Sequence, residues 1–202
     1  MVNHIHLDLV GGLSGDMFIS SMLDAFPQFK KGLAQVIVDA GFPDLVELET
    51  LDHDDGTLTG TRFTVTAIDQ EGHHHHRHYR EIEDRLQGSN LDTMTRDNAL
   101  EIFRLIAEVE AAIHGKKVED VAFHEVGAWD SIADIVLAAH LIASVGADSW
   151  SISAIPAGSG FVETAHGRLP VPAPATARLL EGFELLDDGL EGERVTPTGA
   201  AI

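Results

Sequence analysis

The chain has 202 residues, 44% of them hydrophobic, which is enough for one large domain with a sizeable core. Its 33 acidic and 13 basic residues give a net charge of −20, which argues against nucleic acid or a membrane surface as a partner. The sequence lacks cysteine, a signal-peptide layout and any apolar run of the roughly 20 residues that a membrane span needs. Disulfides and thiolate ligands are therefore excluded, and we expect a cytoplasmic protein.

The first third of the chain predicts a strand, two helices and a hairpin. Apolar and polar side chains alternate near the N-terminus, then recur at helical spacing up to a proline and a glycine. Two further strand patterns flank a turn rich in aspartate and glycine. In chain order we expect a strand over residues 4–10, helices over 17–26 and 28–40, and paired strands over 46–51 and 59–68.

The rest of the chain is mainly helical, with two unusual segments. We expect helices over residues 79–86, 95–114, 129–145 and 175–180, and a strand over 150–155. Residues 71–78 are polar and rich in histidine, and we call them the His-rich loop. Residues 156–174 are rich in glycine and proline and predict little regular structure. The order of elements indicates one domain over residues 1–202, of the α/β (α+β) class, with a mixed β-sheet covered by helices.

A glycine-rich turn follows the first predicted strand. Asp8 stands at the end of the strand, where side chains of α/β proteins often face a ligand crevice. The turn over residues 11–16 leads into a helix, whose free N–H groups can bind an anion. Ser14, Gly15 and Asp16 are therefore candidates for binding a substrate or cofactor together with Asp8. An ordinary helix cap by Ser14 or Asp16 is the simpler interpretation of the turn alone.

The His-rich loop supplies five candidate metal ligands. They are His73, His74, His75, His76 and His78. Neutral imidazole is a ligand that suits nickel, zinc, copper and cobalt. A flexible run of this kind can capture such ions but is a poor catalytic site, because nothing fixes the rings. The simpler interpretation is a solvated loop with incidental metal affinity.

The segment over residues 123–134 places an imidazole and three carboxylates beside a predicted helix. Asp130 and Asp134 lie one helical turn apart, so a metal ion, a cationic substrate or water must separate their charges. Apolar residues on both sides of the helix predict that it is buried, which makes plain solvation less favourable. His124 and Glu125 precede the helix and could complete a ligand set or an acid–base pair. These four residues are our catalytic candidates, and an acidic first turn of structural origin is the alternative.

Two later segments could surround an anion with backbone amides, hydroxyls and basic groups. The candidates are Gly158, Ser159, Gly160, His166, Arg168, Thr196 and Thr198. Ordinary turn chemistry explains each of them when it is taken alone.

The remaining histidines are interpreted as surface or structural residues. They are His6, His53, His114 and His140. His114 precedes Gly115 at a predicted helix end, where a basic side chain is expected.

Taken in order, these segments resemble the LarC family, the nickel-insertion proteins of nickel–pincer cofactor synthesis. The matching segments are residues 7–18, the His-rich loop, and residues 123–128, 130–134, 158–162, 165–167, 169–176 and 195–202. The resemblance implies a nickel chelatase, or cyclometallase, of the lyase class. Its substrates would be Ni²⁺ and pyridinium-3,5-bisthiocarboxylic acid mononucleotide, and its product would serve lactate racemase-type enzymes.

The resemblance also implies a nucleotide and a second domain. Family members use CTP with Mg²⁺ or Mn²⁺, and they continue past residues 195–199 into a C-terminal LarC domain associated with nucleotide and metal binding. The apolar final residues fit a sequence cut from a longer one. Possible partners are therefore that domain, the mononucleotide substrate and further copies of the chain, with neither nucleic acid nor membrane.

Two other functions fit the same residues. The chain could be a nickel carrier in which the His-rich loop is the functional element and the acidic helix turn is structural. It could instead be a metal-dependent phosphohydrolase that uses Asp8, Asp16, Asp130 and Asp134. The resemblance favours nickel insertion, with the His-rich loop capturing the ion and passing it to a fixed site.

Overall fold

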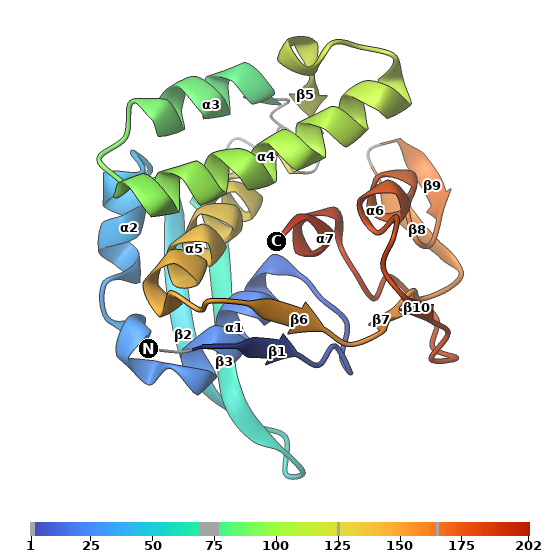
Figure 1. Ribbon diagram of the computed structural model, residues 1–202, viewed down its shortest axis with the longest axis horizontal. Helices are drawn as coiled ribbons and strands as arrows, with labels where there is room; N and C mark the ends of the chain where they lie inside the picture. Colours follow the sequence, from blue (N-terminus) through green and yellow to red (C-terminus); the bar gives the residue numbers. More distant parts are fainter. Residues whose placement is uncertain (1–2, 69–76, 125, 165) are drawn as a thin grey trace.

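Figure 1 shows the computed structural model of the chain, which describes residues 3–68, 77–124, 126–164 and 166–202. The helices are Gly15–Ala25 (α1), Leu33–Asp39 (α2), Tyr79–Gln87 (α3), Thr93–His114 (α4), Trp129–Val145 (α5), Pro174–Leu179 (α6) and Pro197–Ala201 (α7), with short 3-10 turns at Pro27–Lys30 (η1) and Val118–Asp120 (η2). The strands are Ile5–Leu7 (β1), Val46–Asp54 (β2), Thr59–Ala67 (β3), Arg77–His78 (β4), Ala122–Phe123 (β5), Trp150–Ile152 (β6), Ile155–Pro156 (β7), Phe161–Thr164 (β8), Gly167–Pro170 (β9) and Leu185–Leu186 (β10).

The mixed α/β class is confirmed, but the strands do not join into one broad sheet. Within the described residues they pair two by two, in five small sheets. Strands β1 and β6 are parallel, whereas β2–β3 and β8–β9 are antiparallel hairpins. The hairpin predicted after residue 45 is confirmed, and it extends away from the helices (Figure 1). The strands can remain short because a helix forms the centre of the fold.

Helix α5 is that central element. Most of the helix is covered, since Ile132, Ile135, Val136, Leu137 and Leu141 have no exposed surface, although Ser144 is exposed. Helix α4 packs along one side, while α1, α2 and strand β3 pack against the others. The prediction of a buried helix over Trp129–Val145 is confirmed, with the same boundaries. Truncating one such side chain to alanine typically costs about 2–5 kcal/mol.

Two predicted boundaries differ from the structure. The helix expected over residues 28–40 is divided into η1 and α2, because Gly32 between them has a φ of 113°. The prediction of little regular structure over residues 156–174 is wrong, since β8 and β9 form a hairpin there. Val162 pairs with Leu169 across that hairpin, in strands of only four residues that glycines and prolines obscure in the sequence.

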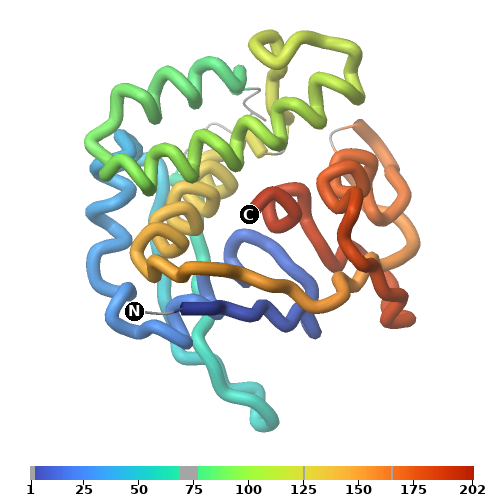
Figure 2. The backbone as a smooth tube through the Cα atoms, in the orientation of Figure 1, coloured from blue at the N-terminus to red at the C-terminus, as the bar shows by residue number. Residues whose placement is uncertain are grey.

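The C-terminal segment lies beside the loop that follows β1, as Figure 2 shows in red and blue. The Leu13 N–H donates to the Arg194 carbonyl at 2.8 Å, and the Leu13 carbonyl accepts from the Thr196 N–H at 3.1 Å. These bonds bring the N-termini of α1 and α7 together, although about 180 residues separate them in sequence. Among the described residues, no helix has both the length and the apolar character to cross a membrane.

Gly12 permits this contact, and its substitution tests how much the contact stabilises the fold. It has a φ of 103°, and an added Cβ would lie 2.0 Å from the Arg194 carbonyl oxygen. Gly12→Ala should therefore cost the left-handed strain of roughly 1–2 kcal/mol plus about 1–3 kcal/mol or more of steric conflict. Urea denaturation measures the loss.

Gly56→Ala is the matched control for this prediction. Gly56 has a φ of 81° in the β2–β3 turn, and nothing lies within 4 Å of its added Cβ. The Gly56→Ala variant should lose only the stability that corresponds to the strain of the left-handed backbone. Equal losses in the two variants would show that the contact with Arg194 contributes little to stability.

Candidate metal centre

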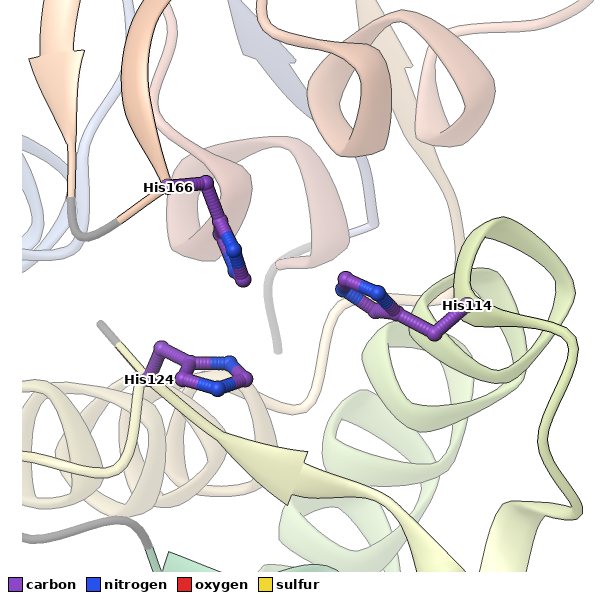
Figure 3. Close-up of side chains that lie close together, drawn as sticks. All are labelled: His114, His124 and His166. Carbon is purple, nitrogen blue, oxygen red and sulfur yellow. The ribbon is translucent and has the colours of Figure 1, made fainter.

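Three histidines from separate parts of the chain converge at one point. His114 ends α4, His124 follows β5, and His166 lies in the turn between β8 and β9. One ring nitrogen from each lies within 4.8 Å of the other two, and Figure 3 shows the rings facing a common centre. A metal bound at about 2.0–2.1 Å would bring such nitrogens to roughly 3–3.5 Å from one another. Small side-chain rotations would therefore complete a three-imidazole site.

The three rings form an open cluster. Their centroids are 4.4 Å apart for His124 and His166, 5.1 Å for His114 and His166, and 6.1 Å for His114 and His124. His124 is half-buried, whereas His114 and His166 are exposed. Three ligands on one side of an ion leave positions open for water or substrate on the other. Imidazole suits nickel, zinc, copper and cobalt, so the donor set fits a transition metal.

The folded core holds His124 in place. Phe123, the preceding residue, is 1% exposed and contacts the rings of Tyr79 and Phe103 at 6.2 and 6.3 Å. In the β8–β9 turn, the Thr164 hydroxyl accepts from the His166 N–H and donates to the Gly167 carbonyl. Two of the three imidazoles are thus mounted on ordered backbone, as a specific site requires.

A carboxylate supports the third imidazole. Glu110 lies one helical turn before His114, and its Oε2 is 3.2 Å from the His114 Nε2. Carboxylates that bind the second nitrogen of a ligating histidine fix the ring and raise its basicity. If Glu110 keeps this contact with Nε2, a metal would bind His114 through the other ring nitrogen, Nδ1.

Sequence reasoning missed His114 as a member of this centre. Its place before Gly115 is that of an ordinary helix C-terminus, and the structure confirms that Gly115 caps α4. Only the folded structure brings its ring close to those of His124 and His166. His140, by contrast, lies against Thr95 and Ser144, in agreement with the structural role predicted for it.

A pocket of about 250 Å³ lies near the three histidines, and we call it the carboxylate pocket. It unites six residues predicted from three distant segments: Ser14, Gly15, Asp16, Asp134, Thr196 and Thr198. The Ser14 hydroxyl donates to Asp16, and the Thr196 hydroxyl accepts from the Gly199 N–H at 3.1 Å. The pairing of Leu13 with the C-terminal segment holds these groups together.

Asp134 is the most perturbed group of the carboxylate pocket. Burial, together with the nearby Asp16 and Asp130 carboxylates, raises the pKa of Asp134 to about 8. Its Oδ1 is buried and has no hydrogen-bond partner among the described residues. An added Cβ on Gly15 would lie 2.8 Å from the Asp134 Oδ2, so a glycine at this position lets α1 approach the carboxyl group.

The other candidate residues that the structure describes lie outside the linings of these two sites. Asp8 lines a separate pocket between β1 and α1, and Asp130 accepts from the Ser131 N–H. The Ser159 hydroxyl donates to the Leu190 carbonyl, in the turn that contains Gly158 and Gly160. Arg168 stacks on Phe161 at 4.1 Å. His78 is exposed at the end of β4, and His73, His74, His75, His76 and Glu125 lie outside the described residues.

Comparison with known proteins identifies the family. The sequence model of the family described as Nickel insertion protein matches residues 5–202. A relative from Citrifermentans bemidjiense that carries a nickel-insertion name is 44% identical over 197 residues. The match covers 98% of this chain and 50% of the relative's length. A relative from Pelobacter propionicus with the same kind of name is 43% identical over 205 residues. That match covers 100% of this chain and 51% of the relative's length. No solved structure shows a significant match.

The match covers almost the whole chain, including the three histidines of the candidate metal centre. The chain belongs to the nickel insertion protein family, as the LarC-type resemblance predicted. It spans about half the length of the curated relatives that it matches.

Glu110→Ala should weaken nickel binding about 10–100-fold, because His114 would lose the carboxylate that orients it. Isothermal titration with Ni²⁺ measures the change, in a background in which His73–His76 are serine so that the His-rich loop does not contribute. Glu108→Ala, on the same helix but paired with Arg104, is the control and should bind nickel normally. Equal affinities in the two variants would contradict the role of Glu110.

Asp134→Asn should change how stability depends on pH. The folded Asp134 has a pKa of about 8, against an ordinary value of 3.8 for an aspartate, so between these values the folded state binds a proton that the unfolded state lacks. The free energy of unfolding should therefore fall as pH rises from about 4 to 8. Asparagine cannot ionise, and the variant should be more stable than the natural protein at pH 8.5 by an amount of the order of a few kcal/mol.

Urea denaturation at pH 5 and pH 8.5 tests the Asp134 prediction. Asp148→Asn, at an exposed position, is the control and should keep the pH dependence of the natural protein. Parallel stability profiles for Asp134→Asn and the natural protein would show that the Asp134 carboxyl group is not destabilising when it ionises.

Proposed function

We propose that this chain holds Ni²⁺ at His114, His124 and His166 while the ion is inserted into an organic acceptor. The observation that carries the proposal is the convergence of three imidazoles from α4, β5 and the β8–β9 turn, in a member of the nickel insertion family. Imidazole binds nickel less tightly than thiolate does. The chain has no cysteine and therefore supplies no thiolate.

The open side of the three-histidine centre suits transfer better than storage. An ion with three imidazoles keeps positions that water occupies and that donor atoms of an acceptor can take. As these donors bind, the imidazoles can leave one by one, so the ion moves without passing through a bare state. A site closed by four or more protein ligands would resist such an exchange.

The acceptor proposed here is pyridinium-3,5-bisthiocarboxylic acid mononucleotide, and the product is the nickel–pincer cofactor. The support is the LarC-type resemblance, which implies a product with two sulfur–nickel bonds made by the thiocarboxylate groups of the acceptor. In the same proposal the activity is that of a lyase and uses CTP with Mg²⁺ or Mn²⁺. The nucleotide would bind mainly to the half of the relatives' length that this chain does not span.

The carboxylate pocket belongs to the same proposed active site. Glu193 and Pro197 line both this pocket and the one beside the three histidines, so the two share a wall. We propose that Asp16 and Asp134 act there on the acceptor or on an accompanying divalent ion. The His-rich loop would collect nickel and pass it to the fixed imidazoles.

Single replacements of the three histidines test the proposed function. His114→Ala, His124→Ala and His166→Ala should each lower nickel affinity at least tenfold, in the background in which His73–His76 are serine, because one of three imidazole ligands is lost. Isothermal titration gives the affinity, and the absorbance of the nickel product reports insertion by the longer protein that contains this chain. His53→Ala, in the exposed β2–β3 hairpin, should change neither.

Two outcomes would redirect the proposal. Unchanged nickel affinity in all three variants would refute the three-histidine centre. Loss of nickel binding with normal insertion at high nickel would favour the alternative of a carrier module. One observation favours that alternative. His114 and His166 are exposed, which makes it easier to load and release the ion.

A further inference from the structure

Arg77 stands within the His-rich loop, but it cannot take part in the capture of a metal ion. A guanidinium group stays protonated in proteins and offers only hydrogen-bond donors, so it has no lone pair for a cation. The structure gives Arg77 a defined place in the fold. It is half-buried and begins β4, the strand that leads into α3.

We propose that Arg77 is a positioning residue that holds His124 in the three-histidine centre. Its backbone and its side chain contact the two ends of the segment over residues 123–129, which we call the His124 segment. The inference rests on the proposed function. It adds a residue that acts on the metal through a protein ligand and does not itself touch the ion.

The backbone of Arg77 holds the first end of the His124 segment. Strands β4 and β5 are antiparallel, and Arg77 pairs with Phe123. The Tyr79 N–H continues this pairing by donating to the Val121 carbonyl at 2.9 Å. Phe123 also packs in the core, where only 1% of its surface is exposed. The residue before His124 is therefore held both by its backbone and by its side chain.

The side chain of Arg77 holds the second end of the His124 segment. Its Nη1 donates a hydrogen bond to the carbonyl of Gly127, a buried residue whose carbonyl needs a partner. The central carbon of the guanidinium group lies 3.6 Å from the centre of the Trp129 ring. Cation–π attraction acts within about 6 Å of a ring centre, so this contact is a close one. One side chain thus joins the turn before α5 to the first residue of that helix.

The two candidate sites both depend on the His124 segment. It supplies His124 to the three-histidine centre, and Val126 lines the carboxylate pocket. A specific site requires its ligands to be held within about 0.5 Å of their productive positions. Loss of the contacts at Gly127 and Trp129 would release one end of the segment, so the His124 ring would have more positions to occupy.

Arg85 provides a matched control, because it stacks on the same ring but donates its hydrogen bond elsewhere. Its guanidinium carbon lies 5.1 Å from the centre of the Trp129 ring and 5.3 Å from that of Phe42. Its Nη1 donates to the Gly41 carbonyl at 3.0 Å, just after α2. Comparison of Arg77→Met with Arg85→Met therefore separates the contact to the His124 segment from the presence of a cation near Trp129.

A double-mutant cycle on nickel affinity tests the proposal, in the background in which His73–His76 are serine. By isothermal titration, Arg77→Met should weaken Ni²⁺ binding about 10–100-fold, as the loss of support for a metal ligand typically does, whereas Arg85→Met should stay within about threefold of the natural affinity. Because Arg77 acts through His124, adding Arg77→Met to His124→Ala should change the affinity less than about threefold. Additive losses in the double variant, or normal affinity in Arg77→Met, would overturn the proposal.

Backbone NMR of the metal-free chain gives a second test that does not depend on nickel. In the natural protein and in Arg85→Met, the His124 and Gly127 amides should have order parameters of about 0.85, the value of rigid backbone. In Arg77→Met both values should fall below about 0.6. Equal values in the three proteins would overturn the proposal.

The two tests distinguish a failure of this inference from a failure of the proposed function. Unchanged nickel affinity in His124→Ala would refute the metal centre, and the order parameters would still decide whether Arg77 holds the segment. Weaker nickel binding in His124→Ala with normal binding in Arg77→Met would leave the metal centre in place and refute the role of Arg77. Arg77→Gln, which is too short to reach Gly127, replaces Arg77→Met in both tests if that variant does not fold.

Discussion

The backbone pairing of Leu13 with Arg194 and Thr196 is the constraint on which both cavities depend. It brings the start of α1 beside the start of α7, and so places Asp16 close to Thr196 and Thr198. The same segment carries Glu193 and Pro197 into the wall between the two pockets. Close approach of two backbones leaves no room for side chains, which is why glycines recur at these crossings. An added Cβ on Gly199, for instance, would lie 2.3 Å from the Leu13 carbonyl oxygen.

The buried helix α5 supplies the second condition for the site. Because most side chains of the helix are apolar and buried, the core encloses its first turns and largely removes Asp134 from water. A carboxyl group in that position resists ionisation, and two neighbouring carboxylates add to the effect. A carboxyl group whose pKa is raised by burial and by neighbouring carboxylates, in the wall of a pocket, is a candidate functional residue.

Local patterns in the sequence predict much of this fold, because they arise from neighbouring residues. The α5 helix and the β2–β3 hairpin are confirmed, as their apolar spacing and turn residues are distinctive. Asp16, Asp134 and Thr198 were each candidates from separate motifs, but only the folded structure shows that they line one pocket. The pairing of strands in twos and the role of His114 could not be predicted, because both depend on which distant segments pack together. A histidine before a capping glycine looks the same whether or not two other imidazoles lie within reach.

The separation of nitrogen and oxygen ligands into adjoining sites has a physical consequence for metal handling. Borderline ions such as nickel favour imidazole, whereas magnesium and manganese favour carboxylate and hydroxyl oxygens. His114, His124 and His166 offer only nitrogen, and the carboxylate pocket offers only oxygen from its side chains. Glu193 and Pro197 form the wall between the two sites, and Glu110 and Glu193 also bring carboxylate oxygens to the side of the histidines. The three imidazoles would therefore favour nickel over magnesium or manganese, whereas the described lining of the carboxylate pocket has no nitrogen side chain with which to compete for nickel.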